Sequence, residues 1–122
     1  MSDDWDHLTE RYAKFVSDRD WDQFHTPQNL AIAASVEANE LLENFLWFED
    51  PSSESVQEDD ELMAAVRDEM ADVMIYMIGL ANQLDIDLQA AVAEKIERNE
   101  ERFDEERVDE INEYLTDWQE DD

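Results

Sequence analysis

The chain has 122 residues, with 36 acidic residues against 8 Lys and Arg, no cysteine and a formal net charge of −28. This length suits one domain, the lack of cysteine excludes disulfides and thiolate chemistry, and the charge disfavours duplex nucleic acid as a partner. The single glycine, two prolines and long runs of helix-forming residues predict an all-α protein. With no stretch of about 18 apolar residues and a polar, acidic start, we expect no membrane span, no secretory signal and a cytoplasmic location.

The first predicted helix covers residues 4–18. Its apolar side chains recur at helical spacing on one face, and this face consists of Trp5, Leu8, Tyr12, Phe15 and Val16. An aromatic-rich connection follows this helix. Thr26 and Pro27 then predict the start of a second helix, because the threonine hydroxyl can cap it and proline suits its first position. We expect the second helix to continue to residue 46.

Residues 47–60 contain a proline, three serines and many acids, and predict a loop. A third helix is expected over residues 61–84. Gly79 lies inside it and is less favourable there than alanine by about 1 kcal/mol, so we expect close helix packing at this position. Asp87 can cap a fourth helix that continues to residue 106.

The C-terminal residues 108–122 are a separate acidic extension. Val108, Ile111, Leu115 and Trp118 lie at helical spacing, which predicts a short fifth helix. Its apolar face needs a partner, and the spacing does not distinguish the domain itself from a second subunit.

Two pairs of carboxylates lie three residues apart on predicted helices, Glu37 with Glu40 and Glu69 with Asp72. This spacing places each pair on one helix face, and the neighbouring positions on these faces are largely apolar. Burying unpaired carboxylates is unfavourable by several kcal/mol, so a bound cation is the simplest explanation. Hard oxygen ligands favour Mg²⁺, with Mn²⁺ as a second choice. For any single pair, a solvated acidic surface is the alternative.

Other side chains could contact a ligand near these acids. Lys95, Asn99 and Arg102 share one face of the fourth helix and suit contacts with phosphate, sugar or base, although a solvated helix face explains the spacing equally well. The aromatic rings could stack on a nucleobase or belong to an ordinary core or interface. These rings are Trp21, Trp47 and Tyr76.

Four ordered segments resemble the MazG-like all-α nucleoside triphosphate pyrophosphohydrolases, and within them the dCTP pyrophosphatase branch. The segments are residues 20–30 (DWDQFHTPQNL), 45–47 (FLW), 69–76 (EMADVMIY) and 95–102 (KIERNEER). The resemblance implies a four-helix-bundle-type MazG-like domain over residues 1–107, with residues 108–122 as an additional short helix. It also implies a homodimer or homotetramer.

The resemblance further implies Mg²⁺-dependent cleavage between the α and β phosphates, which gives a nucleoside monophosphate and pyrophosphate. The implied substrates are dCTP-like or modified deoxynucleotides, and the implied role is sanitation of the nucleotide pool. The implied metal ligands are Glu37, Glu40, Glu69 and Asp72, and we expect Glu40 to be the general base. The implied substrate-binding residues are Tyr12, Trp21, Trp47, Tyr76, Lys95, Asn99 and Arg102. Relatives in this branch can carry histidine at the place of Tyr12, so the base selectivity stays open.

The charge of −28 also predicts adaptation to high salt, because salt screens the self-repulsion that destabilises a strongly acidic fold. One alternative to an enzyme is a non-catalytic acidic helical interaction module that binds a basic partner. A family member that has lost its activity is another.

Overall fold

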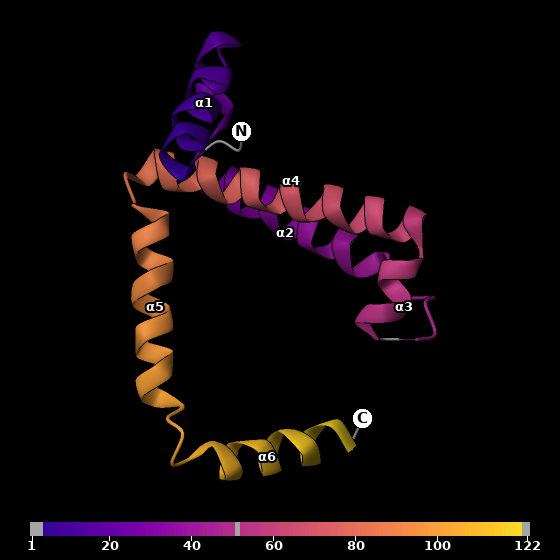
Figure 1. Ribbon diagram of the computed structural model, residues 1–122. Helices are drawn as coiled ribbons and strands as arrows, with labels where there is room; N and C mark the ends of the chain where they lie inside the picture. Colours follow the sequence, from indigo (N-terminus) through magenta and orange to yellow (C-terminus); the bar gives the residue numbers. More distant parts are fainter. Residues whose placement is uncertain (1–3, 51, 121–122) are drawn as a thin grey trace. The chain divides into compact units, whose positions relative to one another are not determined.

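The computed structural model describes residues 4–50 and 52–120, and these ranges contain helices and no strand (Figure 1). The elements are α1 (Trp5–Asp18), the 3₁₀ helix η1 (Asp22–Phe24), α2 (Pro27–Glu43), α3 (Ser53–Glu58), α4 (Asp60–Leu84), α5 (Leu88–Arg102) and α6 (Val108–Glu120). The predicted all-α fold is therefore confirmed. No helix in the described ranges is long and apolar enough to cross a membrane.

The chain divides into two compact units, with the boundary between Ile86 and Asp87. In the first unit α4 contacts α1, α2 and α3, and its contact with α2 is the most extensive. The buried apolar side chains of this unit are Val16, Leu30, Ala34, Ile78 and Ala81. This core is small. Because the contact between α2 and α4 is the most extensive, their packing is the main apolar contribution to the stability of the unit.

The predicted close packing at Gly79 is confirmed. A Cβ atom at this position would lie 3.3 Å from Cδ2 of Leu30 and 3.5 Å from Cε1 of Tyr12. Glycine therefore lets α2 and α1 approach α4 at one point. This packing offsets the weak helix propensity of glycine.

The helix starts follow the capping residues that the sequence predicts. Thr26 Oγ1 accepts a hydrogen bond from the backbone N–H of Asn29 at 3.1 Å. Asp87 Oδ1 accepts one from the N–H of Ala90 at 3.0 Å. Each bond satisfies a backbone donor that the first turn of a helix leaves without a partner.

Three predicted boundaries are wrong. Helix α2 ends at Glu43 rather than at residue 46, because the chain leaves it in tight turns. The predicted loop 47–60 contains α3, whose first turn is capped by Ser52. Helix α5 ends at Arg102 rather than at residue 106, since Phe103 leaves the helical conformation with ψ at 55°.

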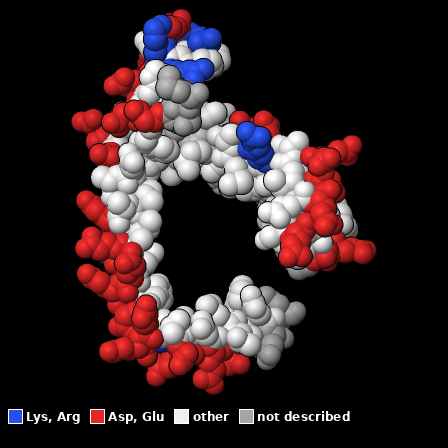
Figure 2. All heavy atoms as spheres, in the orientation of Figure 1, with Lys and Arg blue, Asp and Glu red and all other residues white. Residues whose placement is uncertain are grey.

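The second unit contains α5 and α6, and no described side chain of either helix is buried. The predicted C-terminal helix is confirmed as α6. Acidic side chains gather along one side of α5 and of α6, whereas the other side of each helix is free of them in this view (Figure 2). On α6 the apolar residues include Leu115 and Trp118, with exposed fractions of 49% and 59%. The division into a family domain over residues 1–107 and an extension over 108–122 stays a prediction.

Candidate functional site

Five acids from α2 and α4 form what we call the acid cluster: Glu37, Glu40, Asp68, Glu69 and Asp72. Carboxylate oxygens of Glu37, Glu40 and Glu69 lie within 4.8 Å of one another, as do those of Asp68, Glu69 and Asp72. The two groups share Glu69. Because α2 and α4 run antiparallel, with Leu30 beside Gly79, the two predicted carboxylate pairs face each other across the helix interface.

The acid cluster is electrostatically strained without a cation. Oε2 of Glu37 and Oε2 of Glu69 are both buried and have no hydrogen-bond partner among the described residues. The pKa of Glu37 is raised, first by the neighbouring Glu69 carboxyl, with which it can share a proton, and then by burial. The pKa of Glu40 is raised mainly by the adjacent Glu37 carboxyl. Like charges at this distance disfavour ionisation of all the carboxyls together.

These observations fit a divalent cation. The ligands are all carboxylate oxygens, which Mg²⁺ and Mn²⁺ prefer. The two buried oxygens without partners suit coordination of a cation, since buried polar atoms are otherwise hydrogen-bonded. Of the four predicted ligands, Glu37, Glu40 and Glu69 come together in one group, and Asp72 joins Glu69 in the other. Their role as metal ligands stays a prediction.

The raised pKa values predict an unusual pH dependence of stability in chelator-treated protein. A carboxyl whose pKa is raised in the folded state contributes most to stability below its unfolded value of about 4.3, and this contribution is lost as the pH rises through the folded value. We therefore expect the denaturant midpoint of unfolding to fall as the pH rises above the unfolded value of about 4.3, and to fall less in Glu69→Gln. Denaturant titrations at several pH values measure this difference.

The control for this prediction is Glu10→Gln, which removes one charge from an exposed position on α1, outside the acid cluster. It should keep the steep pH dependence of the unmodified protein. Equal slopes for Glu69→Gln and Glu10→Gln would contradict the prediction, because general charge repulsion would then account for the whole effect.

Next to the acid cluster lies a cavity of about 580 Å³ between α1 and α4, which we call the aromatic cavity. Its wall combines apolar and aromatic side chains with a few polar groups. The lining residues are Trp5, Leu8, Arg11, Tyr12, Phe15, Trp21, Ala71, Asp72, Met74, Ile75, Tyr76 and Ile78. Asp72 belongs to both the cavity and the acid cluster, so the two are contiguous.

Three predicted substrate-binding residues lie in the aromatic cavity: Tyr12, Trp21 and Tyr76. Partial burial raises the pKa of the Tyr12 phenol, and the nearby Tyr76 adds to this shift. The Tyr12 hydroxyl therefore stays protonated at neutral pH and can donate a hydrogen bond. Apolar walls with a few polar groups are typical of a small-molecule site.

The turn after α1 places Trp21 in the cavity wall. Its backbone N–H donates to the Val16 carbonyl at 3.0 Å, and the N–H of Asp20 donates to the Ser17 carbonyl at 3.0 Å. This is a Schellman motif, with Asp20 at the left-handed position at φ 56°. The Trp21 ring then meets Phe15 edge-on at 5.6 Å between ring centroids.

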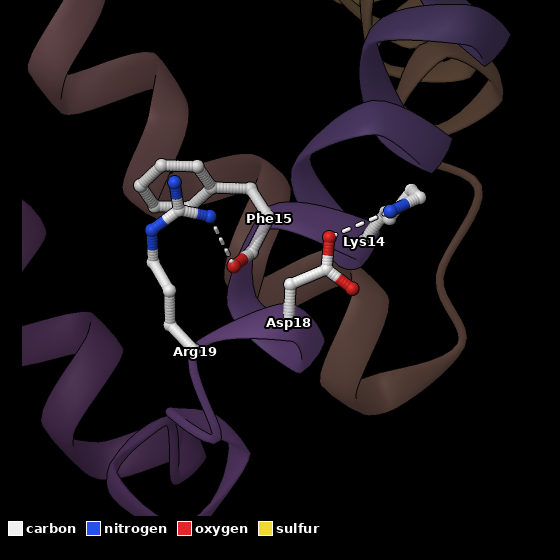
Figure 3. A network of polar contacts seen from close by, with 4 residues as sticks. All are labelled: Lys14, Phe15, Asp18 and Arg19. Atoms are coloured by element: carbon white, nitrogen blue, oxygen red, sulfur yellow. Dashed lines mark hydrogen bonds and ion pairs between the residues drawn. The ribbon is translucent and has the colours of Figure 1, made fainter.

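Charged side chains make contacts near the end of α1 (Figure 3). The Arg19 guanidinium lies over the Phe15 ring, 3.7 Å from its centroid, and donates to the Phe15 carbonyl at 3.0 Å. Lys14 pairs with Asp18 at 2.6 Å. The cation over Phe15 helps to fix the ring against which Trp21 rests.

The left-handed residue of this turn gives a testable prediction. Asp20→Val should lower the free energy of unfolding by about 1–2 kcal/mol, because a β-branched residue is strained at positive φ. Asp20→Gly should cause no such loss, since glycine adopts this conformation freely. Urea unfolding in high salt measures both variants, and equal stabilities of the valine and glycine variants would show that the turn is not constrained.

The structure places the remaining predicted substrate-binding residues on the turn after α2 and on α5. Trp47 lies on the turn after α2 with 91% of its surface exposed, and it is not among the residues that line the cavity. Lys95, Asn99 and Arg102 lie on α5, in the second unit. Their roles stay predictions.

Sequence reasoning missed Asp68 and Arg11. Asp68 lies four residues before Asp72 on α4, so the spacing of one helical turn was the available signal. Arg11 precedes Tyr12 and lines the aromatic cavity. No sequence pattern marks it, because its place in the wall depends on how α1 packs against α4.

A family model and two curated proteins match most of this chain. The MazG-like family model matches residues 32–118. Human dCTP pyrophosphatase 1 is 40% identical over 96 residues, and rat dCTP pyrophosphatase 1 is 39% identical over 94. Each alignment covers 75% of this chain and 54% of the relative, so the chain spans about half the length of these curated relatives.

A solved structure is similar over nearly its whole length. The crystal structure of a pyrophosphatase from Archaeoglobus fulgidus superimposes with a TM-score of 0.75 at 33% sequence identity. The match covers 86% of this chain and 96% of that chain. The chain therefore shares its all-α architecture with the pyrophosphatase from Archaeoglobus fulgidus.

Proposed function

Because the chain belongs to the MazG-like family, as the four sequence segments predict, we propose that it is a nucleotide pyrophosphatase. In this proposal it cleaves nucleoside triphosphates between the α and β phosphates and releases a nucleoside monophosphate and pyrophosphate. One observation carries the proposal: an acid cluster with two buried, unpartnered oxygens adjoins an aromatic cavity through Asp72. A triphosphate bound at the acids would place its base toward the cavity.

In this proposal Glu37, Glu40, Glu69 and Asp72 hold Mg²⁺, with Mn²⁺ as a substitute. The bound ion would neutralise the triphosphate and lower the pKa of a water molecule. The proximity of Asp68 to Glu69 and Asp72 lets it orient these ligands or add a ligand of its own. The protein contributes fixed carboxylate positions on two helices, which limits the reorganisation needed on binding.

Glu40 is the proposed general base. A general base must lie within hydrogen-bond reach of the proton that it abstracts, and Glu40 lies beside Glu37 and Glu69 in the acid cluster. In the proposed reaction Glu40 takes a proton from the water that attacks the α-phosphorus, and pyrophosphate leaves with the electron pair of the broken P–O bond.

The aromatic cavity is the proposed site of the base and sugar, with dCTP-like or modified deoxynucleotides as substrates. Tyr12, Trp21 and Tyr76 supply rings that can stack on a base. We also propose substrate contacts for Trp47, Lys95, Asn99 and Arg102, which are supported by the family resemblance of their segments. The biological role that follows is sanitation of the nucleotide pool.

Product analysis tests the proposed function. The protein is incubated with each deoxynucleoside triphosphate and Mg²⁺ in high-salt buffer, and the products are separated by ion-exchange chromatography. Monophosphate and pyrophosphate in equal amounts are the expected products. Release of inorganic phosphate would indicate a different bond, and much faster turnover of purine than of pyrimidine nucleotides would overturn the proposed dCTP-like preference.

We further propose a cytoplasmic, salt-adapted homodimer or homotetramer that does not bind duplex nucleic acid. Large apolar side chains on α2 and α4 are exposed, including Leu42 at 57% and Met70 at 58%, and exposed apolar surface favours association. The net charge of −28 supports adaptation to salt and repulsion of nucleic acid. Light scattering after size-exclusion chromatography in high salt measures the subunit number.

A further inference from the structure

Gly79 is the only glycine of the chain. It is buried and lies five residues before the last residue of α4, Leu84. Glycine weakens a helix interior, so the position needs a compensating reason. The neighbours supply one, since α1 and α2 both approach α4 here, through Tyr12 and Leu30.

The two neighbours differ in their freedom to move. Leu30 is 2% exposed and belongs to the core between α2 and α4. Its Cδ2 atom would be 3.3 Å from a Cβ at position 79, and the close-packed core leaves it little room to withdraw. Tyr12 would be in ordinary contact at 3.5 Å, and its ring borders the aromatic cavity.

A side chain larger than alanine at position 79 would therefore displace Tyr12 rather than Leu30. The Tyr12 ring lies 5.9 Å from the Phe15 ring and 6.3 Å from the His25 ring, measured between centroids. These neighbours restrict its movement along α1, whereas the cavity is open space. Displacement would push the ring into the cavity and reduce the volume available to a bound base.

We propose that Gly79 is a positioning residue for base selection: it lets the Tyr12 ring sit back against α4 and so sets how large a base the aromatic cavity admits. This inference rests on the proposed function, in which the base of the nucleotide occupies the cavity. Gly79 itself touches no substrate and acts through Tyr12.

Gly79→Val tests the proposal through the ratio of purine to pyrimidine turnover. We expect kcat/KM for dATP and dGTP to fall about tenfold more than kcat/KM for dCTP and dTTP, the range expected for a few methyl groups in a pocket. The loss should lie in KM, because the acid cluster is not displaced. Gly79→Ala should leave the ratio unchanged, because its Cβ would be in ordinary contact with Tyr12. Gly79→Ser, which also adds an atom beyond Cβ, should shift the ratio in the same direction as valine by less, and it carries the test if the valine variant fails to fold.

Ala64→Val is the matched control, since Ala64 is an exposed position on α4 outside the cavity. It adds a similar β-branched side chain to the same helix and should leave the ratio unchanged. A second control adds Tyr12→Leu to Gly79→Val. If Gly79 acts through Tyr12, the smaller residue at position 12 should abolish most of the effect of the valine, so the two substitutions should be non-additive.

Equal losses for purine and pyrimidine nucleotides in Gly79→Val, or additive effects with Tyr12→Leu, would overturn the proposal while leaving the proposed function intact. Failure of the unmodified protein to hydrolyse any nucleotide would instead overturn the proposed function, and this inference with it. The two failures are thus distinguishable in one set of assays.

Discussion

Replacing Glu69 with glutamine is expected to reduce the proposed Mg²⁺-dependent hydrolysis of nucleoside triphosphates by more than about 100-fold. Glu69 belongs to both groups of the acid cluster, so one substitution removes a charged ligand from each. Loss of residues that merely orient metal ligands costs about 10–100-fold in affinity or activity, and loss of a shared ligand should exceed this. Product chromatography and calorimetric titration with Mg²⁺ measure the two effects.

Two controls separate this loss from a folding defect. Glu61→Gln makes the same change at an exposed position on the same helix and should retain activity. In chelator, Glu69→Gln should unfold at a higher denaturant concentration than the unmodified protein, because it removes the carboxyl that raises the pKa of Glu37. Full activity of Glu69→Gln would favour the alternative of an acidic interaction module.

Dialysis from molar salt into dilute buffer is expected to unfold most of the helical structure. The net charge is −28. Repulsion between these charges extends over about 3 Å at 1 M salt and over about 30 Å at 0.01 M salt, because salt screens it. Against this repulsion stands a small core, with five buried apolar side chains among the described residues. Circular dichroism at 222 nm during dialysis measures the loss of helix, which should return when salt is restored.

The control for salt is a parallel dialysis in which sucrose replaces the salt at equal osmolality. Sucrose favours compact states without screening charge, so it should protect far less than salt if repulsion drives the unfolding. Retention of the full helical signal in dilute buffer would refute salt adaptation. The experiment is independent of catalysis and can be interpreted even if the substrate is unknown.

The sequence by itself determined the helical segments α1, α2, α4, α5 and α6 and the residues that share a face on each, whereas it did not indicate α3. Capping residues such as Thr26 and Asp87 and the apolar spacing on α1 are local signals, because a helix repeats every 3.6 residues. The same periodicity put both acids of each pair on one face, and the single glycine indicated the point of closest packing. Ordered motifs along the chain sufficed to indicate the family.

Local signals were weaker at the ends of elements. The stretch after α2 contains few strong helix formers, yet Ser52 caps α3 within the predicted loop. Helix α5 ends four residues early because Asp104 accepts a hydrogen bond from the N–H of Arg107 at 3.1 Å, in the turn that leads into α6. Such competing local bonds decide boundaries that average propensity does not resolve.

Only the tertiary structure decided which distant residues meet. The antiparallel packing of α2 on α4 brought Glu37 and Glu40 within reach of Glu69. The contact of α1 with α4 created the aromatic cavity and placed Arg11 in its wall, while Trp47 stayed outside it. Periodicity fixes the direction of a side chain from its own helix, but a site forms where two helices cross, and that depends on the packing of residues far apart in the chain.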